Sequence, residues 1–353
     1  MPLRKEREAK MSEITLGRSS QEGFLVYLPE RIKQTVNRLP RERAQELEEL
    51  RIRAGLPLMA VFRDGDWFIE EGGRLTRTFS RGIKISGDEL KELFYQMCEH
   101  SVYAYQDEIQ RGFITLKGGH RAGICGTVVY DGDRIKGMRD ISSVCIRMSR
   151  QITGCAEKVF RAVQRGNTDI YNTLILSPPR CGKTTLLRDL CRLVSKGSEG
   201  GFTGLRTAVV DERSELAASY RGLPQNDLGP RTDVLDGCRK SEGIELMLRS
   251  MAPDVILVDE LGSQKDVESI KNAWNAGVRI VATAHAYGLE DFKKRWGMGG
   301  LADENGFERY IILGIDNGKR WVRVMDKDGR EHNFADEANR RTDDFYRLHS
   351  HRS

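Results

Sequence analysis

The chain has 353 residues, 39% of them apolar, which is enough for two compact domains with cores of their own. Lys and Arg exceed Asp and Glu by 57 − 52 = 5 in a chain that is 31% charged with both signs mixed, so the charge does not demand a nucleic-acid partner. No apolar run approaches the roughly 18 residues that cross a bilayer, and the charged N-terminus does not continue into the apolar segment of a secretory signal. We therefore expect a cytoplasmic protein with no segment inserted in a membrane.

The cysteines support a reducing compartment. Their number is odd, and their spacing contains neither a CxxC pair nor a zinc-ligand pattern. They are Cys98, Cys125, Cys145, Cys155, Cys181, Cys191 and Cys238.

The first part of the chain predicts a short extension and a small domain. Residues 1–24 are expected to be a disordered extension, in which Met11 is an alternative start. Residues 25–150 mix helical and strand patterns and predict an N-terminal α+β domain. One helix in it has a readable start, because Ser86 and Glu89 have the spacing of a capping box before an apolar helical face.

The rhythm changes in residues 151–330, where short apolar strands alternate with helical segments. Such continuous apolar strands are typical of a parallel sheet covered by helices on both faces. The predicted strands cover 173–176, 208–210, 255–258, 278–283, 310–313 and 321–325, and the predicted helices 184–194 and 266–276. Residues 219–238 are expected to be a long loop, and 331–353 a polar tail.

The strongest motif is LILSPPRCGKTTLLRDL, an apolar strand that enters a tight loop and then a helix. Backbone N–H groups of 180–185 can surround a phosphate at the helix start, Lys183 can neutralise the outer phosphates, and the Thr184 hydroxyl can ligate Mg²⁺. Ser177 departs from the usual pattern, which has a glycine there. The alternative is a plain strand–turn–helix junction. The expected nucleotide-binding residues of the loop are Ser177, Pro178, Pro179, Arg180, Cys181, Gly182, Lys183, Thr184 and Thr185.

A phosphate loop that hydrolyses nucleotide also needs a metal ligand and an oriented water. Asp259 and Glu260 follow the apolar run 255–258, so both carboxylates are expected at the same sheet edge as the loop. We expect Asp259 to hold Mg²⁺, partly through water, and Glu260 to act as the general base. The alternative is that the pair caps the next helix.

Two further strand ends carry polar groups. Asp211 and Glu212 follow 208–210 and are candidates for the metal or water shell around the nucleotide, with a solvated helix cap as the alternative. His285 follows 278–283 and is a candidate sensor of the γ-phosphate, although a lone histidine at a strand end is more often structural.

The order of these blocks resembles the RecA-like ATPases of type II and type IV secretion systems, which have a phosphate loop, an acidic box, a magnesium box and a histidine box in sequence. The corresponding blocks here are 177–185, 211–215, 254–260 and 283–286. Between about residues 45 and 325 the chain is more similar still to the stage III sporulation protein AA family of endospore-forming bacteria. The segments that carry this resemblance are GGHRAGICG, LILSPPRCGKTTLLRD, VVDERSELA, GPRTDVLDGCRK, LRSMAPDVILVDELG and NAGVRIVATAHA.

The resemblance implies an ATP- and Mg²⁺-dependent motor of the sporulation channel complex, in the mother-cell cytoplasm. Related motors form hexamers and act on an inner-membrane platform protein, so the chain would be peripheral to the membrane through its partners. An N-terminal-domain arginine reaches the phosphates in such rings; Arg147 is the first candidate and Arg139 the second, with solvated surface arginines as the alternative. Secretion motors generally have Gly-Glu in the magnesium box, so Asp259 favours the sporulation branch.

Two other functions remain open from the sequence. A RecA-like ATPase that handles nucleic acid is suggested by arginines at 111, 121, 134 and 139, but no stacking aromatics alternate with them, so nucleic acid is not favoured as a partner. A switch protein that binds nucleotide in order to assemble and hydrolyses it slowly is the other alternative.

Overall fold

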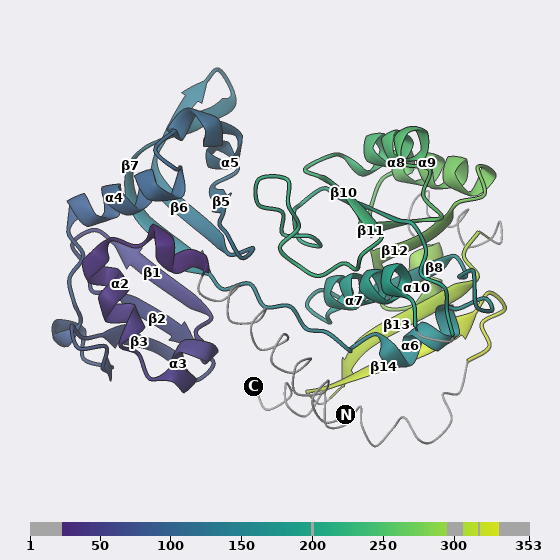
Figure 1. Cartoon of the computed structure of the whole chain (residues 1–353), viewed down its shortest axis with the longest axis horizontal. Helices are drawn as coiled ribbons and strands as arrows, with labels where there is room; N and C mark the ends of the chain where they lie inside the picture. Colours follow the sequence, from purple (N-terminus) through teal and green to yellow (C-terminus); the bar gives the residue numbers. More distant parts are fainter. Residues whose placement is uncertain (1–22, 199–200, 295–305, 317, 332–353) are drawn as a thin grey trace, which may run out of the picture. The chain divides into compact units, whose positions relative to one another are not determined.

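The computed structural model describes residues 23–198, 201–294, 306–316 and 318–331 (Figure 1). Of the predicted extension, only Gly23 and Phe24 are described, and they begin the 3-10 helix Gly23–Tyr27. The predicted polar tail, apart from Glu331, lies outside the described residues. The described chain divides into two compact units: the first runs to Arg150 and also takes Ala218–Gln225, and the second takes Gln151–Ala217 and the described residues from Asn226 onward.

The first unit contains a seven-stranded antiparallel sheet in the order β4-β3-β2-β1-β7-β6-β5. Its core lies between this sheet and the helices, and Leu50, Ile52, Leu93 and Ile146 are among its fully buried side chains. The strands are β1 Glu49–Arg53, β2 Met59–Phe62, β3 Gly65–Ile69, β4 Leu75–Thr76, β5 Phe113–Thr115, β6 Arg121–Asp131 and β7 Arg134–Arg147. The helices are η1 Gly23–Tyr27, α2 Glu30–Asn37, α3 Arg41–Glu46, η2 Phe79–Arg81, α4 Gly87–Met97, η3 Val102–Tyr105 and α5 Gln106–Gln110.

The second unit contains a seven-stranded sheet in the order β10-β9-β11-β12-β8-β13-β14, parallel except for the edge strand β14. The strands are β8 Thr173–Ser177, β9 Thr207–Asp211, β10 Thr232–Asp236, β11 Val255–Leu261, β12 Arg279–His285, β13 Arg309–Asp316 and β14 Lys319–Asp326. The helices are α6 Glu157–Val163, α7 Lys183–Lys196, α8 Lys240–Ser250, α9 Gln264–Asn275 and α10 Leu289–Lys293.

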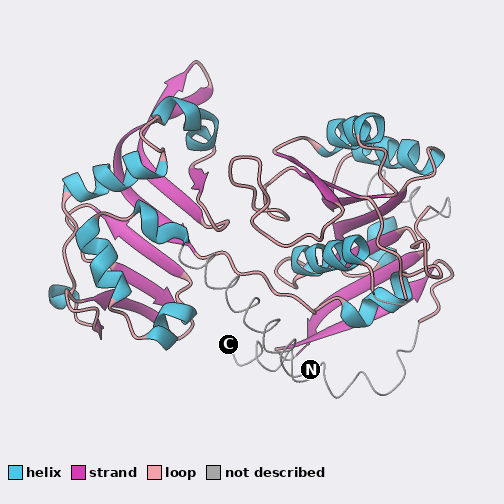
Figure 2. Cartoon of the chain, viewed as in Figure 1, coloured by secondary structure: helices cyan, strands magenta, loops and turns pink. Residues whose placement is uncertain are grey.

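Helices cover both faces of this second sheet (Figure 2). Alternate side chains of each strand point to opposite faces. Ile175 and Leu257 therefore pack with α6 and α7 on one face, whereas Leu174 and Ile256 pack with α8, α9 and α10 on the other. Burial on both faces is why the strands are continuously apolar in the sequence. The predicted doubly wound α/β fold is confirmed.

One predicted helix start is present in the structure, whereas one predicted loop contains a strand. The capping box predicted at Ser86 is present, with the Ser86 hydroxyl accepting from the Glu89 N–H and the Glu89 carboxylate accepting from the Ser86 N–H. The prediction of a long loop over 219–238 is wrong at Thr232–Asp236, because these residues form β10, which pairs with β9 at the sheet edge. An edge strand buries little apolar surface. Thr232–Asp236 accordingly lacks the continuous apolar run that the central strands have.

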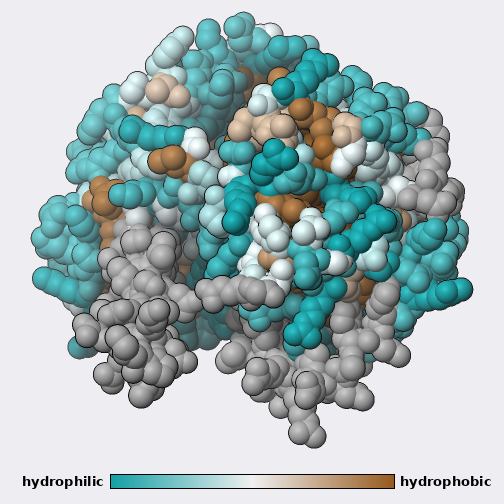
Figure 3. Space-filling model, turned by 45° about the vertical axis from the view of Figure 1, so that its right-hand side comes forward, coloured by the Kyte–Doolittle hydropathy of each residue, from teal (hydrophilic) through white to brown (hydrophobic). Residues whose placement is uncertain are grey.

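The surface in view in Figure 3 is mainly hydrophilic, with hydrophobic areas of limited extent. Single large apolar side chains are nevertheless exposed, for example Tyr103 and Tyr287. None of the helices in the described part of the chain combines the length and apolar character that a membrane span requires.

Candidate active site

The loop between β8 and α7 leaves the start of α7 open. β8 is buried along its whole length and ends at Ser177, whose hydroxyl donates to the Pro178 carbonyl at 2.8 Å. Arg180 and Gly182 have positive φ angles of 65° and 96°, which turn the chain sharply into the helix. The first N–H groups of a helix have no partner within it, and no side chain in the described part of the chain caps α7. The loop therefore presents free N–H donors at the positive end of a 14-residue helix.

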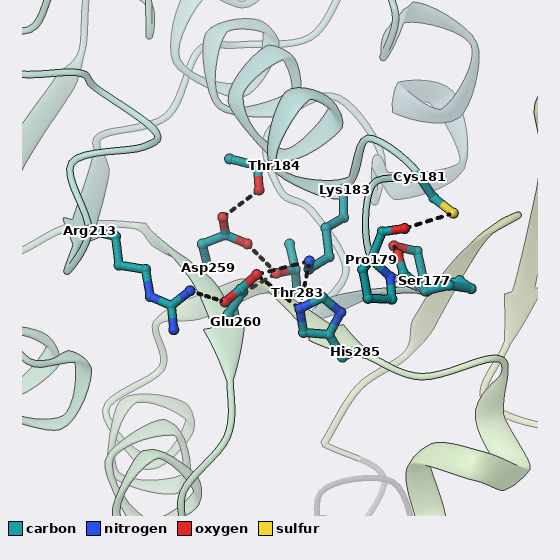
Figure 4. A network of polar contacts seen from close by, with 11 residues as sticks. Ser177, Pro179, Cys181, Lys183, Thr184, Arg213, Asp259, Glu260, Thr283 and His285 are labelled. Atoms are coloured by element: carbon teal, nitrogen blue, oxygen red, sulfur yellow. Dashed lines mark hydrogen bonds and ion pairs between the residues drawn. The ribbon is translucent and has the colours of Figure 1, made fainter. Parts of the chain in front are cut away.

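Lys183 reaches from the first turn of α7 to the ends of β11 and β12 (Figure 4). Its Nζ lies 3.0 Å from Glu260 Oε1 and 3.1 Å from His285 Nε2. His285 Nε2 is in turn 3.0 Å from the same Glu260 oxygen. The Lys183 side chain is only 6% exposed, so this cation and the Glu260 carboxylate pair where water is largely excluded.

The neighbouring residues form a second contact between the same elements. The Thr184 hydroxyl donates to Asp259 Oδ2 at 2.7 Å, and the Thr283 hydroxyl donates to Asp259 Oδ1. The Thr283 oxygen also accepts the Glu260 N–H at 2.8 Å. A buried threonine on β12 thus fixes both the side chain of Asp259 and the backbone of Glu260.

A bulge in β11 explains how adjacent residues serve one site. In a regular strand Asp259 and Glu260 would point to opposite faces. The β11–β12 register shifts between Val258 and Leu261, and Glu260 has a φ of 55°, which is rare for a residue other than glycine. Bulges next to active sites re-aim side chains. Here the bulge directs both carboxylates toward the start of α7.

Arg213, which follows β9, completes the charge balance around Glu260. Its Nη1 donates to Glu260 Oε2 at 2.8 Å, so each carboxylate oxygen faces a cation. Burial acts to raise the pKa of Glu260, but Lys183, Arg213 and His285 together outweigh it and hold that pKa below its usual range.

The residues present fit a magnesium ion with a nucleotide. Mg²⁺ is usually held by one or two carboxylates, substrate phosphates and waters, and it does not need a cage made only of protein ligands. Thr184 and Asp259 place a hydroxyl and a carboxylate next to each other beside the open helix start. Among the residues that the structure describes, none is a hydrogen-bond partner of the buried His285 Nδ1, which leaves a polar atom here for a ligand or water.

The acidic pair after β9 is engaged differently. Both oxygens of the buried Asp211 accept backbone N–H groups of Glu215, Leu216 and Ala217 at 2.8–2.9 Å. Burial raises the pKa of Asp211, although these three hydrogen bonds act to lower it. Glu212 forms an ion pair with Lys240. The structure thus brings Lys183, Thr184, Asp259, Glu260 and His285 together, while a nucleotide role for Asp211 and Glu212 stays a prediction.

The arginines expected to act from the N-terminal domain lie in β7. Arg147 forms an ion pair with Glu49 at 3.2 Å, and the exposed Arg139 lies 3.6 Å from Asp140. Their contact with a nucleotide stays a prediction.

The sequence did not lead us to Arg213 or to the hydrogen-bonding role of Thr283. Arg213 lies in the block 211–215 and Thr283 in the block 283–286. The sequence signals that could have identified them were a cation in the first block and a hydroxyl before His285 in the second.

Comparison with known proteins places the chain in context. Residues 19–331 match the protein family described as "Sporulation stage III, protein AA". Stage III sporulation protein AA of Bacillus subtilis (strain 168) is 37% identical over 303 residues, which cover 86% of this chain and 94% of that protein.

Solved structures share the architecture at low sequence identity. The ATPase DotB of Legionella pneumophila superposes with a TM-score of 0.53 at 13% identity, covering 85% of this chain and 82% of its own. The pilus retraction motor PilT, solved with bound ADP, superposes with a TM-score of 0.52 at 14% identity, covering 87% and 86%. This likeness concerns the fold alone, and it confirms the RecA-like architecture that the sequence predicted.

Proposed function

Because the chain belongs to the sporulation stage III protein AA family, we propose that it is a Mg²⁺-dependent ATPase motor of the sporulation channel complex. It would power assembly of this complex, or transport through it, between mother cell and forespore. One observation carries the proposal: side chains from α7, β11 and β12 converge at the open start of α7. They combine a phosphate-binding cation with two carboxylates.

The proposed reaction is hydrolysis of the terminal phosphoanhydride of ATP. Water attacks the γ-phosphorus, the bond to the ADP oxygen breaks, and Glu260 accepts the proton that the water loses. Lys183 and the first N–H groups of α7 take the charge of the phosphates. His285 lies within hydrogen-bond distance of both Lys183 and Glu260, so it orients the base.

Thr184 and Asp259 would hold the magnesium ion. The ion would supply positive charge to phosphate oxygens during transfer. Thr283 keeps Asp259 in place through its hydroxyl, which makes it a positioning residue of this site.

Binding of ATP must also rearrange the charges. Lys183 pairs with Glu260 in the structure, and the same ammonium is needed by the phosphates. Transfer of Lys183 to the phosphates removes one of the three groups that lower the pKa of Glu260, the others being Arg213 and His285. The base would therefore become more basic when substrate is present.

The motor is proposed to work as a hexamer in the mother-cell cytoplasm, attached to the membrane through an inner-membrane platform protein. Light scattering of the purified chain, with and without Mg·ATP, measures the number of subunits and so tests whether the chain forms a hexamer. A monomer under every condition would contradict it. Stimulation of hydrolysis by membrane-platform protein supports the proposed partner, whereas stimulation by oligonucleotides would support a nucleic-acid motor.

Phosphate release from Mg·ATP by the full chain tests the enzymatic proposal directly. Glu260→Gln should bind ATP about as tightly as the parent and lose turnover by about 100-fold or more, because the base is removed and its size is kept. Lys183→Ala should lose most binding. Hydrolysis at the parental rate by Glu260→Gln would refute the assignment of the base.

A further inference from the structure

We propose that Arg188 of α7 is a positioning residue of the active site, which holds the loop that presents Arg213 to Glu260. This inference rests on the proposed ATPase function. Arg188 lies four residues after Thr184, so the two side chains leave the same side of the helix. On that side Thr184 contacts Asp259, whereas Arg188 contacts the loop 212–217 that follows β9.

The side chain of Arg188, a half-buried residue, donates to backbone oxygens of this loop. Its Nη2 donates to the Glu215 carbonyl at 2.5 Å, and its Nε donates to the Leu216 carbonyl at 2.9 Å. Two donors on one planar group fix the direction of a peptide segment as well as its distance. Burial lowers the pKa of Arg188, and the charges of Asp211 and Asp259 oppose that fall. The two carboxylates thus compensate part of the cost of burying the guanidinium.

The same segment is also bound through its N–H groups. The Asp211 carboxylate, at the end of β9, accepts the N–H groups of 215–217. Arg188 binds the carbonyl groups of the first two of these residues. Both kinds of backbone group in one short segment are therefore held, by β9 through Asp211 and by α7 through Arg188.

Arg213 lies directly before this held segment. Ser214, the residue between them, has a φ of 55°, which is rare for a residue other than glycine. A strained backbone conformation of this kind persists only where the surroundings over-determine it. The bonds from Arg188 and Asp211 fix the chain after this turn, so they determine where Arg213 points. Its Nη1 reaches Glu260 Oε2 at 2.8 Å (Figure 4).

The backbone has to place Arg213, because packing does not. The Arg213 side chain is 64% exposed, and an exposed ion pair restricts a long side chain only weakly. Loss of the Arg188 bonds should therefore release Arg213 and raise the pKa of Glu260, as removal of Arg213 itself would. Because α7 begins at the phosphate loop, Arg188 also links the helix that binds phosphate to the charge around the base.

The test is the pH dependence of ATP hydrolysis by the full chain. In Arg188→Met the acid limb of kcat/KM should move to higher pH by about as much as in Arg213→Met, because both changes take a guanidinium away from Glu260. The double variant should show no further shift, since the two changes remove one and the same contact. ADP affinity should stay near the parental value, because Lys183 is unchanged.

Arg188→Lys separates position from charge. Lysine keeps the cation but cannot donate in two fixed directions, so the acid limb should still move to higher pH, by less than in Arg188→Met. This variant also carries the test if Arg188→Met does not fold. A parental acid limb in Arg188→Lys would mean that the charge alone acts, and it would overturn the positioning role.

Arg192→Gln is the matched control for a loss of stability. Arg192 lies one turn further along α7, and its guanidinium pairs with the buried Asp189 of the same helix at 2.7 Å. The variant should unfold more easily than the parent, because a buried carboxylate loses its cation. Its acid limb should nevertheless stay parental, which would show that lower stability alone does not move the pH profile.

Hydrogen exchange of the nucleotide-free chain needs no turnover, so it separates this inference from the ATPase proposal. The amides of 215–217 should exchange about 10- to 100-fold faster in Arg188→Met, the factor for loss of a hydrogen bond to a charged group. An acid limb that stays in place in Arg188→Met, or shifts that add in the double variant, would overturn the role of Arg188 and leave the ATPase proposal standing. A parent chain without hydrolysis would refute the ATPase proposal, and parental exchange in Arg188→Met would then refute the held loop as well.

Discussion

Arg213 donates from Nη1 to Glu260 Oε2 at 2.8 Å, on the side of the carboxylate that Lys183 does not occupy. The Arg213 side chain is 64% exposed, whereas that of Glu260 is 19% exposed. An exposed arginine therefore helps Lys183 to lower the pKa of Glu260, the largely enclosed proposed base. Such a pair contributes little to stability, but it changes the proton affinity of the carboxylate.

The first prediction concerns the pH dependence of hydrolysis. Arg213 helps to keep the pKa of Glu260 low, and the base must be ionised to accept a proton. Arg213→Met raises that pKa, so activity is lost at a higher pH as the solution is acidified. The acid limb of kcat/KM, which reports the free enzyme, should move to higher pH. At neutral pH, where Glu260 is ionised in both proteins, rates should differ by less than about fivefold.

Arg249→Ala serves as the control for this pH profile. Arg249 is also exposed and pairs with Glu245 on α8, away from Glu260. Its profile should match the parent. An acid limb that stays in place in Arg213→Met would mean that Arg213 does not act on the base.

The second prediction separates metal binding from nucleotide binding. Thr184→Val removes the hydroxyl that lies 2.7 Å from Asp259 Oδ2 and keeps the shape of the side chain. The Mg²⁺ concentration for half-maximal hydrolysis should rise by about tenfold or more, because even an outer partner of a metal ligand is worth about 10- to 100-fold in affinity. ADP affinity without Mg²⁺ should stay near the parental value.

Thr184→Ser restores the hydroxyl and should restore the parental Mg²⁺ requirement. If Thr184→Val shows the parental Mg²⁺ curve, Thr184 is no ligand and its bond to Asp259 is structural. The measurement is phosphate release across a Mg²⁺ titration at fixed ATP.

The sequence was sufficient for those parts of the structure that depend on local pattern. Continuous apolar runs identified the central strands such as β8 and β11, and Ser86 marked a helix start that the structure confirms. β10 was missed because an edge strand is covered less, and its residues are all half-buried or exposed.

Side-chain partners in the site required the folded chain. Nothing in the local sequence indicates that β11 bulges at Asp259, and without that bulge the two carboxylates would diverge. Arg213 is far from Glu260 in sequence, and only the parallel pairing of β9 with β11 brings them together. The sequence therefore named the side chains that the structure brings together at the start of α7, while their orientation came from the tertiary structure.

The third prediction tests whether Asp211 is structural. Its carboxylate accepts three backbone N–H groups from 215–217 and is 2% exposed. Asp211→Ala leaves these donors unpaired and should lower the free energy of unfolding by about 2–4 kcal/mol. Urea unfolding of the full chain, followed by circular dichroism, measures the change.

Asp211→Asn keeps one acceptor oxygen and should lose less stability than Asp211→Ala. Glu212→Gln, at the half-buried neighbouring position, keeps an acceptor oxygen for the largely buried Lys240 and should lose less stability than Asp211→Ala. If Asp211→Ala unfolds like the parent but no longer binds Mg·ATP, Asp211 belongs to the nucleotide shell, as its position at the strand end first suggested.

The last prediction concerns Thr283, which joins β12 to the bulge of β11. Thr283→Val leaves Asp259 Oδ1 and the Glu260 N–H without this partner in a fully buried position. We expect a loss of about 1–3 kcal/mol in stability, the usual effect of an unpaired buried polar group. We also expect a larger fractional loss in kcat than in ADP affinity, because binding uses the loop and turnover uses the carboxylates. Thr283→Ser keeps the hydroxyl and should recover most of both. A Thr283→Val variant with reduced stability but parental kcat would show that the bulge holds its geometry without the threonine.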